Sequence, residues 1–168
     1  MQSKIKALAQ QYATEFIDIR RHLHAHPELS YQEFETSKFV QGKLAEFGIP
    51  FEVKATTGVV GLIKGKKSES RIIALRADMD ALPIKEENDI PYKSKNEGVM
   101  HACGHDVHTA CLLGAAKILN QLKEEREGTV KLIFQPGEER NPGGASYMIK
   151  EGVLENPRPQ AILALHVN

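Results

Sequence analysis

Short apolar runs that alternate with segments of helical periodicity limit most strongly what this chain of 168 residues can fold into. Residues 72–75, 130–134 and 161–165 are mostly apolar, which is typical of strands buried inside a sheet. Residues 51–54 and 59–64 are shorter stretches of β-forming residues. Strands that alternate with helices predict a layered α/β protein with a largely parallel sheet.

The first part of the chain predicts two helices. Apolar residues at helical spacing predict an amphipathic helix from residue 3 to about residue 24, which Pro27 ends. Ser30 and Glu33 have the spacing of a capping box, so a second helix is expected to follow Ser30. Gly48 suits the C-terminal cap of that helix.

The middle of the chain combines a long irregular segment with a regular helix. Residues 77–104 show no periodicity and contain two prolines, which predicts a functional or mobile loop. Residues 107–122 carry one apolar stripe at helical spacing, and Cys111 lies on it, so we expect Cys111 in the core. Residues 145–150 predict a short helix before the last strand.

The charge balance and the cysteine content exclude several classes of protein. Lysine and arginine number 22, and aspartate and glutamate also number 22, so the formal net charge is zero. Binding to nucleic acid or to a membrane surface needs a basic excess, so neither partner is expected. No apolar run approaches the roughly 18 residues of a membrane span. Without a signal-peptide core or a disulfide framework, the sequence predicts a cytoplasmic protein.

Polar residues follow three of the predicted strands at the same kind of position. Asp78 and Asp80 follow the first of these strands, Glu138 and Glu139 follow the second, and His166 follows the third. In open α/β sheets, ligands bind in the crevice outside the carboxyl ends of the strands. The sequence therefore predicts a site where these side chains meet.

Cys103 and His105, separated by one glycine, are the softest pair of potential metal ligands. A thiolate and an imidazole suit zinc or another late first-row divalent ion, and His101, Asp106 and His108 lie close by in the sequence. Two alternatives stay open. Cys103 could instead be a small buried apolar residue. His105 and His108, at i and i+3, could instead form the pair of ligands on one helix face.

The carboxylates admit several roles. Of Glu138 and Glu139, one can bind a metal while the other acts as a general base for an attacking water, unless both belong to a solvated acidic turn. Asp78 and Asp80 can bind a metal, orient a ligand imidazole or cap the loop that follows.

The remaining histidines are equally open. His22, His24 and His26 lie near the end of a predicted helix, where they either stabilise the helix dipole or contribute to a site. His166, taken alone, fits a core histidine better than a ligand.

Five sequence stretches, taken together and in this order, resemble one family: the zinc-type metallopeptidases and aminoacylases. They are similar to its amidohydrolase subfamily of hippurate hydrolases, auxin-conjugate hydrolases and N-acetyl-diaminopimelate deacetylases. The resemblance implies a three-layer αβα fold with a mixed, largely parallel sheet, as a partial catalytic domain of a co-catalytic metallopeptidase. The stretches are RRHLHAHPELSYQE (20–33), LRADMDALPI (75–84), MHACGHDVHTA (100–110), FQPGEE (134–139) and ALHVN (164–168).

Carried over by position, the resemblance implies a role for five residues. Glu138 would be the general base that takes the proton of the attacking water. The metal ligands would be Cys103, His105, Glu139 and His166.

The resemblance also implies one steering aspartate. Asp78 occupies the place of the family's catalytic aspartate, which steers a ligand, and Asp80 is the alternative. In the broader family a histidine stands two residues before that aspartate, but here the residue is Arg76, and Cys103 is the subfamily's substitute. His24 matches a motif histidine to which we assign no role.

The implied function is hydrolysis of the amide bond of N-acyl amino acids or small peptides, with two divalent ions (zinc, manganese or cobalt). Residues 1–168 would be the N-terminal part of the catalytic domain, with the dimerisation domain and the C-terminal part absent. The full-length form would be a homodimer. Two alternatives are a truncated non-catalytic module for metal binding or interaction, and a metal-independent hydrolase in which Cys103 acts with His105 or His108.

Overall fold

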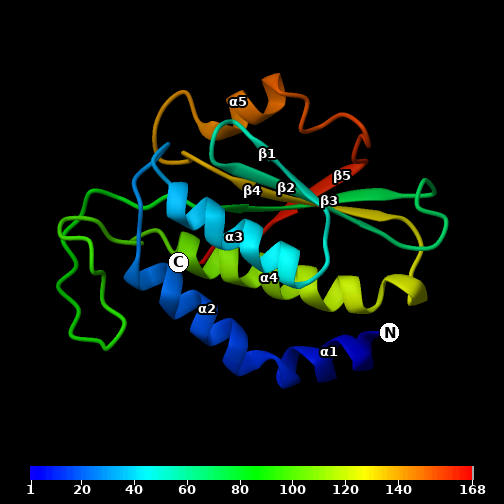
Figure 1. Ribbon diagram of the computed structural model, residues 1–168, viewed down its shortest axis with the longest axis horizontal. Helices are drawn as coiled ribbons and strands as arrows, with labels where there is room; N and C mark the ends of the chain where they lie inside the picture. The colour runs from blue at the N-terminus through cyan, green and yellow to red at the C-terminus, as the bar shows by residue number, and fades with distance from the viewer. Residues whose placement is uncertain (168) are drawn as a thin grey trace.

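A computed structural model describes residues 1–167 as five strands in one sheet with helices on both faces (Figure 1). The predicted three-layer α/β architecture is confirmed. In chain order the elements are α1 (Gln2–Gln11), α2 (Ala13–Ala25), α3 (Phe34–Glu46), β1 (Phe51–Lys54), β2 (Gly58–Lys64), β3 (Ile72–Asp78), α4 (His105–Gln121), a 3₁₀ turn (Lys123–Glu125), β4 (Thr129–Gln135), α5 (Gly144–Lys150) and β5 (Ala161–Ala164).

The strand order is β1-β2-β4-β3-β5, and the sheet is mixed as predicted. β3 runs parallel to both β4 and β5, whereas β2 runs antiparallel to both β1 and β4. In the register, Asp78 lies opposite Gln135, and Arg76 lies opposite Ala164. The carboxyl ends of β3, β4 and β5 therefore meet at one edge, which is where the sequence places the polar residues.

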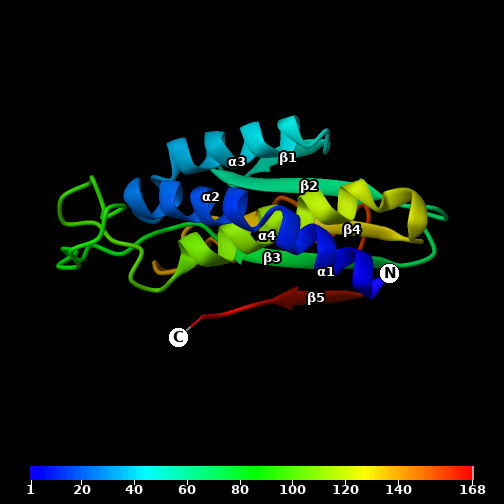
Figure 2. The same ribbon diagram turned by 90° about the horizontal axis from the view of Figure 1, so that it is seen from below.

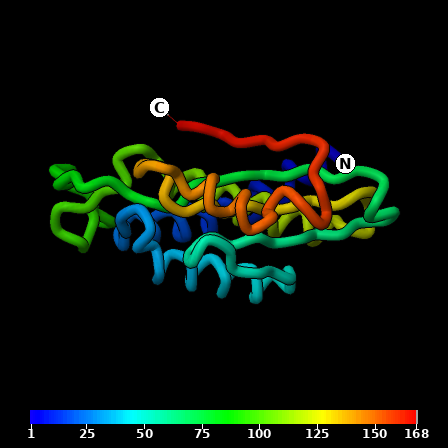
Figure 3. The backbone as a smooth tube through the Cα atoms, turned by 90° about the horizontal axis from the view of Figure 1, so that it is seen from above, coloured from blue at the N-terminus to red at the C-terminus, as the bar shows by residue number. Residues whose placement is uncertain are grey.

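The two faces of the sheet are covered unequally. α2, α3 and α4 cover one face, with α1 beyond them, as Figure 2 shows. Leu44, Leu113 and Phe134 are fully buried in the larger core between these helices and the sheet. α5 crosses the opposite face (Figure 3), where Met148 packs in a smaller cluster with Ile133.

The predicted helix from residue 3 to about residue 24 is wrong in one respect: the chain forms two helices that meet at Tyr12. Neither glycine nor proline marks this break. The Tyr12 hydroxyl donates to the side-chain oxygen of Gln121 at 2.9 Å, and the change in direction lets α1 and α2 both follow α4 (Figure 2).

The predicted capping box is also wrong, because α3 begins only at Phe34. The Ser30 hydroxyl donates to Asp80 instead, at 2.6 Å. Glu28 performs the capping: its carboxylate accepts the backbone N–H groups of Glu35 and Thr36 in the first turn of α3. At the other end Gly48 has a φ of 69°, and Ile49 N–H returns to Leu44, so the predicted C-terminal cap is confirmed.

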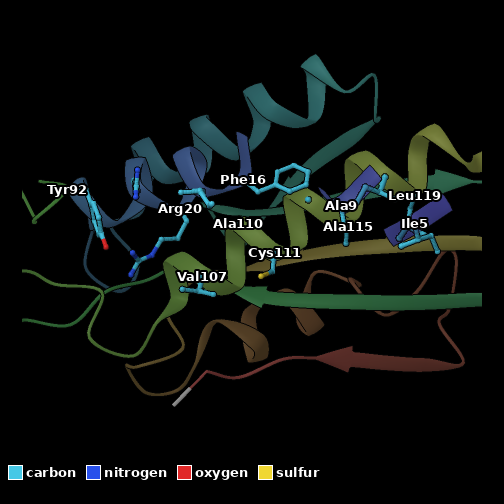
Figure 4. Close-up of a pocket in the computed structure, with 14 residues that line it drawn as sticks. Ile5, Ala9, Phe16, Arg20, Tyr92, Val107, Ala110, Cys111, Ala115 and Leu119 are labelled. Carbon is cyan, nitrogen blue, oxygen red and sulfur yellow. The ribbon is translucent and has the colours of Figure 1, made fainter. Parts of the chain in front are cut away.

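A groove of about 710 Å³ runs between α1, α2 and α4 and is lined mainly by apolar side chains (Figure 4). The prediction that Cys111 lies in the core is wrong. Cys111 is exposed and lines this groove, and it also lines a smaller pocket with Leu75 of β3 and Leu163 of β5. Among the described residues, no helix combines the length and the apolarity needed to cross a membrane.

Candidate metal centre

The segment that carries Cys103 and His105 turns sharply into α4. Gly104 caps α4 with a left-handed backbone, φ 79°, a conformation that favours glycine. A Cβ at this position would also collide with a methyl carbon of Val167. The glycine therefore allows the turn that places Cys103 just before the helix and His105 at its first residue.

Asp80 fixes the orientation of the His105 ring. Nδ1 of His105 donates to the backbone carbonyl oxygen of Asp80 at 2.8 Å, and the same nitrogen lies 3.3 Å from a carboxylate oxygen of Asp80. Because the carbonyl can only accept, Nδ1 carries a proton, and Nε2 is left facing the other side. Nε2 lies 3.8 Å from the Glu139 carboxylate.

The turn after β4 brings Glu139 to the same place. One candidate ligand atom each from Cys103, His105 and Glu139 lie within 4.8 Å of one another. We call these three residues the central cluster. They are three of the four predicted metal ligands, and they come from two elements that are more than 30 residues apart in the chain.

Glu33 and Tyr31 hold the turn after β4 in place through contacts with Gly137 and Arg140. The Glu33 carboxylate is fully buried and accepts the backbone N–H of Gly137 at 2.7 Å, the backbone N–H of Tyr31 at 2.9 Å and the hydroxyl of Thr57 at 2.8 Å. Tyr31 has a φ of 66°, its ring covers Gly137, and its hydroxyl donates to the carbonyl oxygen of Arg140. The turn with Glu138 and Glu139 is therefore held at both ends.

An aspartate that orients a ligand of the central cluster is expected to hold the ring of His105. Asp78 instead contacts His108 and Arg76. One carboxylate oxygen lies 2.6 Å from Nδ1 of His108, and the other pairs with Arg76 at 2.7 Å. Nε2 of His105 is 3.7 Å from Asp78. The oxygens that hold the Nδ1 side of His105 belong to Asp80, so the geometry favours Asp80 as the steering aspartate.

The alternative ligand pair, His105 and His108, is also found together. One candidate ligand atom of each lies within 4.8 Å of the other and of an Asp78 carboxylate oxygen. However, both ring nitrogens of His108 already have partners. Nδ1 faces Asp78, and Nε2 accepts the backbone N–H of Val167 at 3.1 Å. His108 therefore anchors the segment after β5, which leaves the central cluster as the better candidate.

His166 is exposed and lies beside His108, with the ring centroids 5.1 Å apart. In the part of the chain that the structure describes, it does not join Cys103 and His105 in a group within ligand distance. Its role as a metal ligand stays a prediction.

The electrostatics of the central cluster fit a divalent cation. Burial, together with the nearby Glu139, raises the pKa of the Cys103 thiol to about 11. Burial would raise the pKa of Asp80 as well, but hydrogen bonds from His105, from Ser30 and from the backbone N–H of Glu139 hold it at about 2. A sulfur, an imidazole nitrogen and a carboxylate oxygen form the donor set that late first-row divalent ions prefer.

Glu138 is exposed on the same turn as Glu139. Its backbone N–H, like that of Glu139, faces the Asp80 carboxylate. Adjacent residues on an irregular turn can direct their side chains differently, so one carboxylate can join the cluster while the other stays free.

A buried charge network behind α4 escaped the sequence analysis. Nδ1 of His24 lies 2.8 Å from Asp106, and Nε2 lies 3.0 Å from Glu86. Arg20 pairs with the same oxygen of Asp106 at 2.8 Å. His24 therefore joins α2 to α4 and to the long segment between β3 and α4, which carries Glu86. The pattern of i, i+2 and i+4 already separates His24 from the other two histidines of this helix.

His101 is another buried histidine near the site. Burial lowers its pKa to about 4, and within the described residues neither ring nitrogen has a hydrogen-bond partner. Nothing in the sequence distinguishes it from a metal ligand.

Fold and site together define an α/β protein with a candidate divalent-metal centre at the carboxyl edge of its parallel strands. The sequence profile of peptidase family M20/M25/M40 matches residues 74–168, which is more than half of the chain. The chain belongs to this family of hydrolases.

Several relatives have known names. The N-acyl-L-amino acid amidohydrolase of Geobacillus stearothermophilus is 50% identical over 153 residues, which cover 90% of this chain and 41% of that protein. The N-acetyl-L-cysteine deacetylase of Bacillus subtilis is 50% identical over 153 residues, covering 90% of this chain and 36% of that protein. The chain thus spans well under half the length of these relatives.

Solved structures agree. A dinuclear metal-binding peptidase of the M20 family, the YXEP protein of Bacillus subtilis, superposes with a TM-score of 0.88 at 45% identity, covering 95% of this chain and 44% of that chain. A structure from methicillin-resistant Staphylococcus aureus superposes with a TM-score of 0.93 at 41% identity, covering 100% and 44% respectively. The predicted family resemblance and fold are confirmed.

Proposed function

We propose that the whole protein hydrolyses the amide bond of N-acyl amino acids or small peptides with two divalent ions. The observation that carries this proposal is the convergence of Cys103, His105 and Glu139 beside a second carboxylate, Glu138. The names of the amidohydrolase and deacetylase relatives support the substrate class. His166 completes the proposed set of ligands, which is open to zinc, manganese or cobalt.

The proposed roles of the chain's own residues follow from where they lie. Divalent ions, when bound, would lower the pKa of a bound water and polarise the amide carbonyl. Glu138 would take the proton from the attacking water and return it to the departing amine nitrogen. Asp80 would keep Nε2 of His105 directed at the cluster through its contacts with Nδ1.

The metal-independent alternative is disfavoured by the state of its nucleophile. A cysteine attacks as a thiolate, but burial and Glu139 raise the pKa of the Cys103 thiol to about 11. This alternative also leaves Glu138 and Glu139 without a chemical role.

The test is amide hydrolysis of N-acetyl amino acids and hippurate by metal-depleted protein, to which zinc, manganese or cobalt is then returned. We expect activity to depend on the metal. Activity that survives thorough chelation would favour the cysteine mechanism. Metal binding without hydrolysis, in a folded whole protein, would favour a non-catalytic metal-binding module.

We also propose that residues 1–168 are the N-terminal part of a catalytic domain in a longer, homodimeric protein. The relatives are more than twice as long as the stretch that this chain covers. The mass and oligomeric state of the natural protein in solution test this proposal.

A further inference from the structure

Two histidines on the outer face of α2 form an imidazole cluster that is separate from the central cluster. His22 lies in the last turn of α2 and His26 is the residue that ends the helix, so the two are four residues apart at its C-terminal end. Their ring centroids lie 4.6 Å apart, and both residues are exposed. His24, between them, points into the protein against Asp106.

The hydrogen bond of His26 determines which ring nitrogen is left as a ligand. Nδ1 of His26 donates to the carbonyl oxygen of His22 at 2.7 Å. The carbonyl can only accept, so Nδ1 carries a proton, and the lone pair of the neutral ring lies on Nε2. Imidazoles that bind metals almost always have their second nitrogen held in this way.

His22 is oriented by packing instead. Its ring stacks on Phe39 with the centroids 4.4 Å apart and the planes at 21°. Partial burial of the otherwise exposed His22 ring, followed by the charges of His26, Lys95 and Lys43, lowers the pKa of His22. At neutral pH the ring is therefore in the neutral form, which is the form that coordinates metals.

The rings of His22 and His26 line a cavity of about 450 Å³ between α2 and α3, and Glu35 lines it too. Two of the three lysines around it have acidic partners: Lys38 pairs with Glu35 at 2.7 Å, and Lys43 pairs with Glu46 at 2.8 Å, whereas Lys95 acts on His22 by its charge alone. These pairs weaken the attraction for an anion, whereas the imidazole lone pairs attract a cation.

We propose that His22 and His26 form a second, surface site for a late first-row divalent ion, for which Ni²⁺, Cu²⁺ and Zn²⁺ are candidates. Two imidazoles one helical turn apart are a recurrent metal-binding pair, and these ions prefer imidazole ligands. Water would complete the coordination, because Glu35 lines the same cavity but pairs with Lys38. This site requires no residue of the proposed catalytic machinery.

The test is a titration of the isotope-labelled chain with Ni²⁺ alone, followed by amide NMR signals. Ni²⁺ is paramagnetic and does not oxidise thiols, so line broadening locates each bound ion. We expect broadening at Leu23, Thr36 and Phe39, which line the cavity, in addition to any broadening around Cys103. His22→Ala and His26→Ala should each weaken the binding at α2 by at least about tenfold, because one imidazole of the pair is lost.

The controls separate this site from its alternatives. Broadening around Cys103 should persist in both variants, and His22→Gln and His26→Gln should behave like the alanine variants if the imidazoles are the ligands. Glu35→Gln should weaken binding less than either histidine variant. The proposal is wrong if neither histidine variant alters the broadening at α2, if no broadening occurs there, or if inorganic phosphate shifts these signals at lower concentration than Ni²⁺ does.

Discussion

Nδ1 of His105 donates to the backbone carbonyl of Asp80, and the carboxylate of the same residue lies 3.3 Å from that nitrogen. One residue thereby fixes both the position and the tautomer of the imidazole in the central cluster. The Asp80 carboxylate is itself held by the Ser30 hydroxyl and by the backbone N–H of Glu139. The loop after β3 and the turn after β4 are thus joined through one carboxyl group.

This relationship predicts that Asp80 and Asp78 differ when each is changed to asparagine. Asp80→Asn should weaken metal binding by about 10- to 100-fold, as expected when the group that orients a ligand is altered. Asp78→Asn should have less than a tenfold effect, because its contacts are with His108 and Arg76. Metal affinities measured by competition with a chelator decide the matter, and the reverse order would return the steering role to Asp78.

The two cysteines provide a matched pair of variants. Cys103→Ser should lower the metal content of the protein and abolish the sulfur-to-metal absorption of the Co²⁺-loaded form, since a hydroxyl does not ionise as a thiol does. Cys111→Ser should leave both unchanged, because Cys111 lies in the groove between the helices. Elemental analysis and ultraviolet absorption are the measurements. Equal metal content in the two variants would remove Cys103 from the centre.

The two glutamates of the turn after β4 should separate chemistry from metal binding. In the whole protein, Glu138→Gln should reduce kcat by about 10²- to 10⁴-fold while the metal content stays normal, as expected for loss of a general base. Glu139→Gln should lose metal as well as activity. Parallel assays of hydrolysis and metal content test this. Loss of metal from the Glu138 variant would exchange the two roles.

Glu33 should matter for stability although it lies behind the cluster. Glu33→Ala removes the acceptor of three donors, two of them buried, and should cost about 3 kcal/mol of unfolding free energy. Glu33→Gln retains one acceptor oxygen and should cost about 1 kcal/mol. Urea unfolding followed by circular dichroism gives both values. Equal costs would mean that the volume of the side chain matters and its hydrogen bonds do not.

His24 should make the stability of the protein depend on pH. Its hydrogen bond to Asp106 raises its pKa although burial opposes this, so the folded protein binds the proton more tightly than the unfolded chain does. This stabilisation is complete below the unfolded pKa of about 6.5 and is lost as the pH rises through the folded pKa. The difference in unfolding free energy between the wild type and His24→Gln should therefore shrink as the pH rises above about 6.5 and through the raised pKa of the folded protein. A difference that grows with pH would contradict the assignment.

Much of the architecture is predictable from the sequence because its signals are local. The apolar run at 72–75 and the mostly apolar run at 130–134 identify β3 and β4, two neighbouring strands inside the sheet, and Gly48 marks the end of α3. The meeting of Asp80 and Glu139 follows from parallel strands whose carboxyl ends share one edge.

Other features depend on long-range contacts that no local pattern encodes. The break at Tyr12 has no glycine or proline signal, and its hydroxyl contacts Gln121, more than a hundred residues away. Ser30 and Glu33 have the spacing of a helix cap, but their side chains hold the site loops instead. Sequence spacing cannot show such competition between a local and a distant partner.

The origin of the central cluster from separate elements has a thermodynamic consequence. Cys103 and His105 stand at the start of α4, whereas Glu139 follows β4, so their three donor atoms are neighbours only while the sheet is assembled. An unfolded chain would disperse them and release the ion. When the concentration of the free ion is a hundred times its dissociation constant, binding would thus raise the free energy of unfolding by about 2.7 kcal/mol.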